Sequence, residues 1–253
     1  MTDASLTTRF TESEFRVGRV LNRTSSVLSR NFLFFFVVTA VAQLPTLLFF
    51  KGTDIKPNTS GAEVAMILAL TLGGLLLMVV LSMLSQAVVL YGAFQNMRGR
   101  EVSFAESLQV GLRRFWPILG MAFLGALLAG LALLALIFPA LILAAMWFVA
   151  APACVVEQLG PWASLQRSRE LTKGHRWKIF GLMVLLLIVS AIAGGTISAA
   201  LTAIGGTLLA MVGSVLWNGA WGAFYAIAVV VTYHDLRAAK EGIDIDQIAA
   251  VFD

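Results

Sequence analysis

The chain carries little charge and almost no cysteine. Only 13% of its 253 residues are Asp, Glu, Lys or Arg, and 59% are hydrophobic. Soluble domains have about a quarter charged residues, so this balance excludes an ordinary soluble globular domain. The single cysteine, Cys154, cannot form an intramolecular disulfide, so cysteine usage indicates no redox compartment.

Four long segments lack Asp, Glu, Lys, Arg and His altogether. They are Asn31–Phe50, Val64–Ala93, Phe115–Val156 and Ile179–Tyr233. Each reaches the roughly 20 residues needed to cross a bilayer core, so we expect an all-α, polytopic integral membrane protein. Pumps, carboxylate-coupled carriers and voltage sensors keep ionisable groups at depth, and the absence of such groups here argues against all three.

The last two segments are each long enough for two helices. Proline ends a preceding helix and a glycine pair favours a turn, so we predict turns at Phe138-Pro139 and Gly205-Gly206. Six transmembrane helices result, over residues 31–50, 64–93, 117–136, 138–156, 179–203 and 208–233.

The basic residues predict the orientation of these spans. With the N-terminal segment 1–30 inside, 16 of the 18 Lys and Arg fall on cytoplasmic segments, including the tail 237–253. Only Lys51 and Lys56 fall outside. The positive-inside rule therefore predicts that both termini are cytoplasmic, and it explains the net charge of +4.

Two inside segments resemble each other. "SLQVGLRRFWPILG" begins at Ser107 and "SLQRSRELTKGHRWKIFG" at Ser164, and residues 1–30 hold a looser version. We predict three repeats, each an interfacial amphipathic helix followed by a transmembrane hairpin, with such helices near 103–115 and 161–173. Ser103 and Glu106 have the spacing of a capping box. The alternative is that inside bias and aromatic belts alone produce this composition.

Two groups of residues could contact ligands. Candidates for lipid headgroups are Arg113, Arg114, Arg167, Arg169, Lys173, Arg176 and Lys178. Their alternative role is orientation and anchoring alone. Polar residues within the spans that could line a cavity are Gln86, Tyr91 and Asn218. Their alternative role is interhelical hydrogen bonding.

The stretches "VVEQLGPWASLQRSRELTKGHRWKIF" and "YHDLRAAKEGID" resemble a bacterial membrane-domain family. That family is named after the membrane-spanning region of certain glycerophosphodiester phosphodiesterases, and YciC-like inner-membrane proteins are related to it. The residues that carry the resemblance are Glu157, Ser168, Glu170, Leu171, Gly174, Tyr233, Asp235 and Arg237. The resemblance implies a bacterial inner-membrane location and mainly a shared fold.

We expect no phosphodiesterase activity, because only about 20 residues follow the last span and a catalytic barrel needs about 250. The favoured function is a non-enzymatic structural, lipid-interacting or partner-subunit role at the cytoplasmic leaflet. The alternative is an uncoupled transporter or permease subunit for a small or amphipathic molecule. Expected partners are anionic phospholipids and a homo-oligomer or another membrane protein, with no nucleic acid, metal or cofactor.

Overall fold

The computed structural model describes residues 15–49, 60–100, 103–135 and 137–241. Every regular element in these ranges is an α-helix. The helices are α2 (Val17–Arg30), α3 (Phe32–Phe49), α4 (Gly61–Met97), α5 (Phe104–Arg113), α6 (Phe115–Ala135), α7 (Ile137–Met146), α8 (Ala150–Val156), α9 (Pro161–Thr172) and α10 (Arg176–Glu241). Residues 1–14 of the predicted N-terminal segment, Lys51, Lys56 and residues 242–253 of the predicted tail lie outside the described residues.

The helices follow one another in three similar groups. In each group a short helix with polar residues precedes strongly apolar ones: α2 before α3 and α4, α5 before α6, α7 and α8, and α9 before α10. Helix α3 packs on α4, and α6 packs on α7. This element order agrees with the predicted succession of a short helix and a hairpin.

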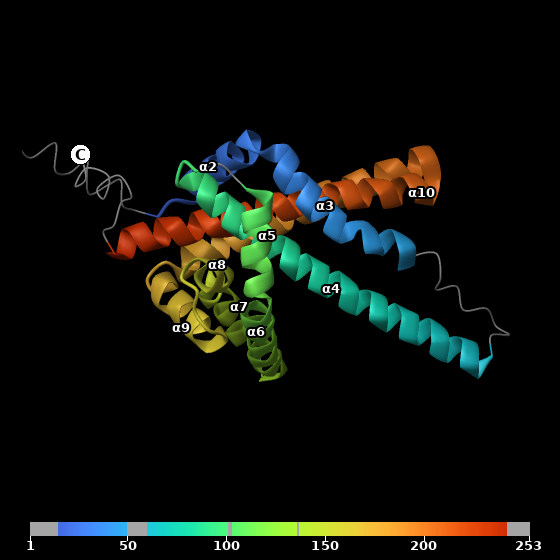
Figure 1. Ribbon diagram of the computed structural model, residues 1–253, viewed down its shortest axis with the longest axis horizontal. Coiled ribbons are helices and arrows are strands. Elements are labelled where there is room, and N and C mark those ends of the chain that lie inside the picture. The colour runs from blue at the N-terminus through green and yellow to red at the C-terminus, as the bar shows by residue number, and fades with distance from the viewer. Residues whose placement is uncertain (1–14, 50–59, 101–102, 136, 242–253) are drawn as a thin grey trace, which may run out of the picture.

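Helix α10 is itself a hairpin of two arms. Gly205 and Gly206 have non-helical backbone angles, and the φ of +69° at Gly206 lies in the left-handed region that favours glycine. The arms touch at Gly194, whose added Cβ would lie 2.8 Å from Nε1 of Trp217. The predicted turn at Gly205-Gly206 is confirmed, and Figure 1 shows the chain folding back there.

The third apolar segment divides into two helices as predicted, but Phe138 and Pro139 lie inside the second of them and not in a turn. Helix α7 begins at Ile137, so Pro139 is its third residue. Proline fits there because the first N–H groups of a helix have no intrahelical partner. The predicted span 138–156 is also divided, since residues 147–149 interrupt the helix between α7 and α8.

The predicted tail begins too early, because α10 continues through Arg237 to Glu241. The second arm, from residue 207 to 241, is therefore about 52 Å long, well beyond a hydrocarbon core of about 30 Å. Helix α4 is similarly long, at about 55 Å. Both helices are therefore long enough to cross the hydrocarbon core and extend beyond it.

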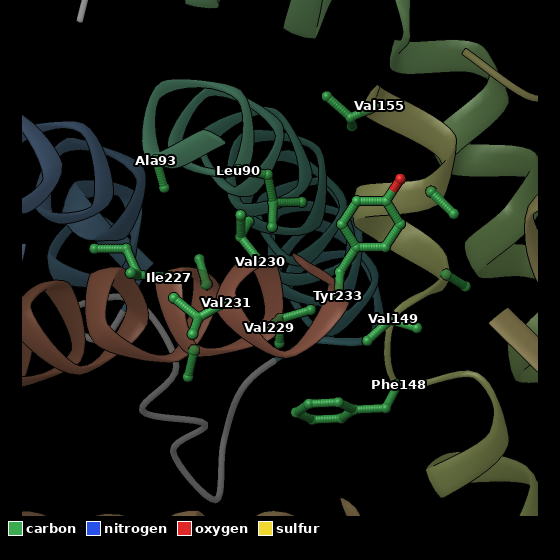
Figure 2. Close-up of a cluster of buried hydrophobic side chains, with 14 of the residues drawn as sticks. Leu90, Ala93, Phe148, Val149, Val155, Ile227, Val229, Val230, Val231 and Tyr233 are labelled. Atoms are coloured by element: carbon green, nitrogen blue, oxygen red, sulfur yellow. The ribbon is translucent and has the colours of Figure 1, made fainter. Parts of the chain in front are cut away.

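Buried side chains gather at one end of these long helices. We call this region the hub and define it as α2, α5, α8 and α9 with residues 85–97 of α4 and 223–241 of α10. Its core includes Leu90, Val155 and Ile227, and Figure 2 shows these side chains in one buried cluster. Away from the hub the long helices diverge, as Figure 1 shows, and only 6% of the apolar window of α4 is buried.

Within the hub, the short helices α2 and α5 pack on the long helices through different types of residue. Helix α2 buries Val20, Thr24 and Val27 and packs on α10, so the apolar side predicted to lie in the membrane contacts protein. Helix α5 docks on α4 through Gly111, whose added Cβ would lie 3.3 Å from Val88. Small residues therefore bring α5 close to α4.

Four helices among the described residues are long and apolar enough to cross a membrane. The number is five if α2 and α3, which meet at a bend of 91°, count as one broken span. Helix α10 enters this count once. It folds back on itself at Gly205 and Gly206, however, so each of its two arms is a separate apolar segment.

Candidate functional site: a closed polar ring in the hub

Five polar side chains form a closed ring where α8, α9 and the end of α10 meet. Arg167 donates from Nε to both carboxylate oxygens of Glu157, at 3.0 and 2.9 Å, and from Nη2 to Glu241. The Tyr233 hydroxyl donates to Glu157 at 2.6 Å. Arg237 closes the ring by donating to Glu241 at 2.7 Å and to the Tyr233 oxygen at 3.4 Å. We call these five residues the polar ring.

The local structure explains why these side chains meet. Glu157 is the C-cap residue of α8, and Arg167 lies in the middle of α9. Tyr233, Arg237 and Glu241 are spaced by four residues, so they share one face of α10. Figure 2 shows the Tyr233 ring projecting from α10 toward α8. The polar ring therefore joins the second group of helices to both ends of the third.

Burial makes these contacts energetically important. The side chains of Glu157, Arg167 and Glu241 are only 17–23% exposed, and Tyr233 is fully buried. A charge removed from water needs a partner, and breaking such a pair costs more than forming it gains. Because Arg167 binds two carboxylates at once, the conformational entropy lost in ordering its side chain is shared by two contacts.

Arg167 stays charged in this setting. Burial alone lowers the pKa of its guanidinium, but the hydrogen bonds with Glu241 and Glu157, and their negative charges, raise that pKa above its ordinary value. The two arginines and two carboxylates of the polar ring therefore balance in charge. Arg167, expected among the lipid-binding residues, is instead occupied by protein carboxylates.

The loop after Glu157 is held by a second arginine. Arg114 donates to the Gln158 carbonyl at 3.0 Å and to its side-chain oxygen at 2.6 Å. Gln158 has a φ of +56°, a conformation that is costly for a residue with a side chain. The two bonds from Arg114 compensate for this cost and position Glu157 next to it.

The remaining residues of the family resemblance mostly support the hub. Ser168 donates to the Met146 carbonyl at 2.8 Å, which is freed where α7 ends. Leu171 is buried in the core, and Gly174 follows α9 with a φ of +91°, the left-handed conformation that often ends a helix. Asp235 accepts from Arg23 of α2 at 3.0 Å. Glu170 differs from these, because it is exposed on α9.

The predicted lipid-binding residues fall into two sets. Arg113, Arg169, Lys173 and Lys178 are exposed, and Lys178 also donates to the Phe15 carbonyl at 3.4 Å. Arg114 and Arg167 bind protein acceptors, as described above. Arg176 is partly buried and lines a cavity with Trp177.

The three predicted cavity residues have separate surroundings. Gln86 lines a groove of about 490 Å³ between α4 and α6, and neither Tyr91 nor Asn218 lines it. Asn218 is exposed on α10. The Tyr91 hydroxyl donates to Glu106 at 2.6 Å, and Gln95 donates to that same hydroxyl at 2.8 Å.

Tyr91 and Tyr233 repeat one arrangement. Each tyrosine donates to a glutamate at 2.6 Å and accepts from the residue four positions later, Gln95 or Arg237. The predicted capping box is only half formed for this reason. Ser103 accepts from the Glu106 N–H, but the Glu106 carboxylate is bound to Tyr91.

The described helices define an all-helical protein with several segments able to cross a membrane. The model of the family described as "Domain of unknown function (DUF7847)" matches residues 102–236, just over half of the chain. The chain therefore belongs to this family. The match spans the second and third helix groups and includes Glu157, Arg167 and Tyr233. No curated protein and no solved structure matches the chain.

Proposed function

We propose that the protein is a non-enzymatic, six-span protein of the bacterial inner membrane that binds anionic lipid headgroups at the cytoplasmic leaflet. In this proposal both termini and the hub are cytoplasmic, and the polar ring holds the second group of helices against the third. The resemblance to the membrane-domain family of glycerophosphodiester phosphodiesterases and YciC-like proteins supports the location and stays a prediction.

The observation that carries this proposal is the exposure of tryptophans beside basic residues. Trp116, Trp162 and Trp177 are 74%, 63% and 76% exposed and lie at the starts of α6, α9 and α10. Tryptophan favours the boundary between headgroups and hydrocarbon. Arg113 and Lys173 lie within four residues of these rings and are exposed, so they are available to phosphate groups.

The surface of α5 supports the same role. Phe104 and Leu112 are 54% and 55% exposed, while Ser107 and Gly111 on another side are buried against the protein. An amphipathic helix with its apolar side open is suited to lie in the membrane interface. This face would hold the hub against the cytoplasmic leaflet.

The topology predicts a specific labelling pattern. In a Cys154→Ser background, Ser60→Cys at the start of α4 should react with a membrane-impermeant maleimide in intact spheroplasts. Lys173→Cys, near the hub, should react only after permeabilisation, because the two positions lie on opposite sides of the bilayer. Labelling of both variants before permeabilisation, or the reverse pattern, would contradict the proposed orientation.

The exposed basic residues predict a preference for anionic lipid. The variant Arg113→Gln/Arg169→Gln/Lys173→Gln should lose the preference for phosphatidylglycerol over phosphatidylcholine by roughly a hundredfold, since each cation near the surface adds about 1 kcal/mol of attraction. Quenching of tryptophan fluorescence by brominated lipids in proteoliposomes measures this preference. Glu170→Gln is the matched control, and removal of this acid should leave the preference equal or stronger. An unchanged preference in the triple variant would refute the proposed function.

A further inference from the structure

A continuous apolar groove runs between α7 and α10. One cavity, of about 230 Å³, is lined by Leu141 of α7 and by Arg176, Trp177 and Phe180 at the start of α10. A second, of about 290 Å³, shares Leu141 and Phe180 and continues along the first arm to Ser190. Because they share these two residues, the cavities form one groove, which we call the α7–α10 groove.

The length of the α7–α10 groove matches one leaflet of a bilayer. From Arg176 to Ser190 the first arm rises by about 21 Å. One leaflet contributes about 15 Å of hydrocarbon, half of a core of about 30 Å. A lipid acyl chain that follows the groove would therefore extend from the headgroup boundary through the hydrocarbon of one whole leaflet.

The lining is apolar and aromatic and opens at the outside of the molecule. Trp221 and Tyr225 of the second arm form one wall opposite α7. Leu141 is 40% exposed and Leu187 is 68% exposed, so the groove is accessible from the surface that the hydrocarbon would cover. An acyl chain can enter such a groove sideways.

The hub end of the groove carries positive charge. The Nε–H of Arg176 is buried and has no hydrogen-bond partner among the described residues. A buried donor without an acceptor is unfavourable, and an anionic oxygen is its strongest acceptor. The exposed Lys173 lies three residues earlier, and Trp177, 76% exposed, follows at the predicted headgroup level.

We propose that the α7–α10 groove binds one anionic phospholipid of the cytoplasmic leaflet, with its phosphate at Arg176 and one acyl chain along the first arm of α10. Charge selects the headgroup at one end, and the apolar walls hold the chain. This inference rests on the proposed function but adds a single retained lipid to the general attraction of the basic surface.

Native mass spectrometry of the full chain, purified in detergent and titrated with phosphatidylglycerol, tests this site. The unmodified chain should retain one phosphatidylglycerol more tightly than phosphatidylcholine. Arg176→Gln should weaken that binding about fivefold, the effect of losing one cation near the surface. Leu141→Trp, at the point where the two cavities join, should reduce retention at least as strongly by filling the groove. Leu131→Trp, on an exposed part of α6, should not change it.

The outcomes separate this site from the general lipid preference. If both Arg176→Gln and Leu141→Trp retain phosphatidylglycerol as the unmodified chain does, the site is refuted. A dimer that persists without lipid and is disrupted by Leu141→Trp would also refute it, because a second copy would then occupy the groove. The preference of the Arg113/Arg169/Lys173 variant for phosphatidylglycerol over phosphatidylcholine is measured independently, by fluorescence quenching. The proposed function can therefore fail or stand whatever happens at Arg176.

Discussion

Glu157→Gln should destabilise the protein by about 2 kcal/mol, because it removes the negative charge shared by Arg167 and Tyr233. Breaking a buried ion pair costs about 3–5 kcal/mol. We expect less here because both side chains keep some solvent contact and Arg167 retains Glu241. Thermal melting of the detergent-purified protein should show a decrease of several degrees in the midpoint.

Glu170→Gln is the matched control for this prediction. Both substitutions remove one negative charge near α9, but Glu170 is exposed, so its effect on the free energy of unfolding should stay within about 0.5 kcal/mol. Equal melting of the two variants would show that the polar ring contributes nothing. A double-mutant cycle of Glu157→Gln with Tyr233→Phe should give a coupling of about 1 kcal/mol, since the two side chains share one hydrogen bond.

The positions of the apolar helices could be predicted well from the sequence. A segment without charge that is long enough to cross a bilayer has few other uses, so the predicted 31–50 and 64–93 correspond to α3 and α4. The turn at Gly205-Gly206 was equally clear, because glycine adopts the left-handed conformation that Gly206 shows. The position of the turn at Pro139 could not be predicted, because proline fits the first turn of a helix as well as the residue after the end of one.

The residues of the polar ring could be predicted only in part. The spacing of Tyr233 and Arg237 by four already places them on one face. The same spacing extends to Glu241, which lies in the predicted tail and not in the predicted span 208–233. The pairing of Glu157 with Arg167 was not predictable in this way. It depends on how α9 folds back against the end of α8.

The docking faces of the short helices were the hardest feature to predict. Hydrophobic periodicity finds a face rich in large apolar residues, yet α9 buries Ser164, Ser168 and Thr172 together with two leucines. The divergence of the long helices has a similar cause. Lipid tails are as apolar as leucine, so an apolar surface does not specify whether it faces lipid or another helix.

Gly219→Leu should have the second large effect, because α3 crosses the second arm of α10 at this glycine. A Cβ added at Gly219 would lie 3.0 Å from Cα and Cβ of Ala40. Thr39 also donates its hydroxyl to the Gly219 carbonyl at 2.6 Å. A leucine would separate the helices and break this bond, at a cost of about 3 kcal/mol or more. Thermal melting of the purified protein measures the loss.

Smaller changes at the same crossing keep the prediction testable if Gly219→Leu does not fold. Gly219→Ala should cost about 1 kcal/mol, and adding Ala40→Gly should recover part of it by removing the close contact with the Ala40 Cβ. The matched control is Gly195→Leu, where an added Cβ meets nothing within 4 Å and leucine has the better helix propensity. If Gly219→Ala and Gly195→Leu melt alike, the close approach of α3 to α10 is not what holds the first hairpin against the third.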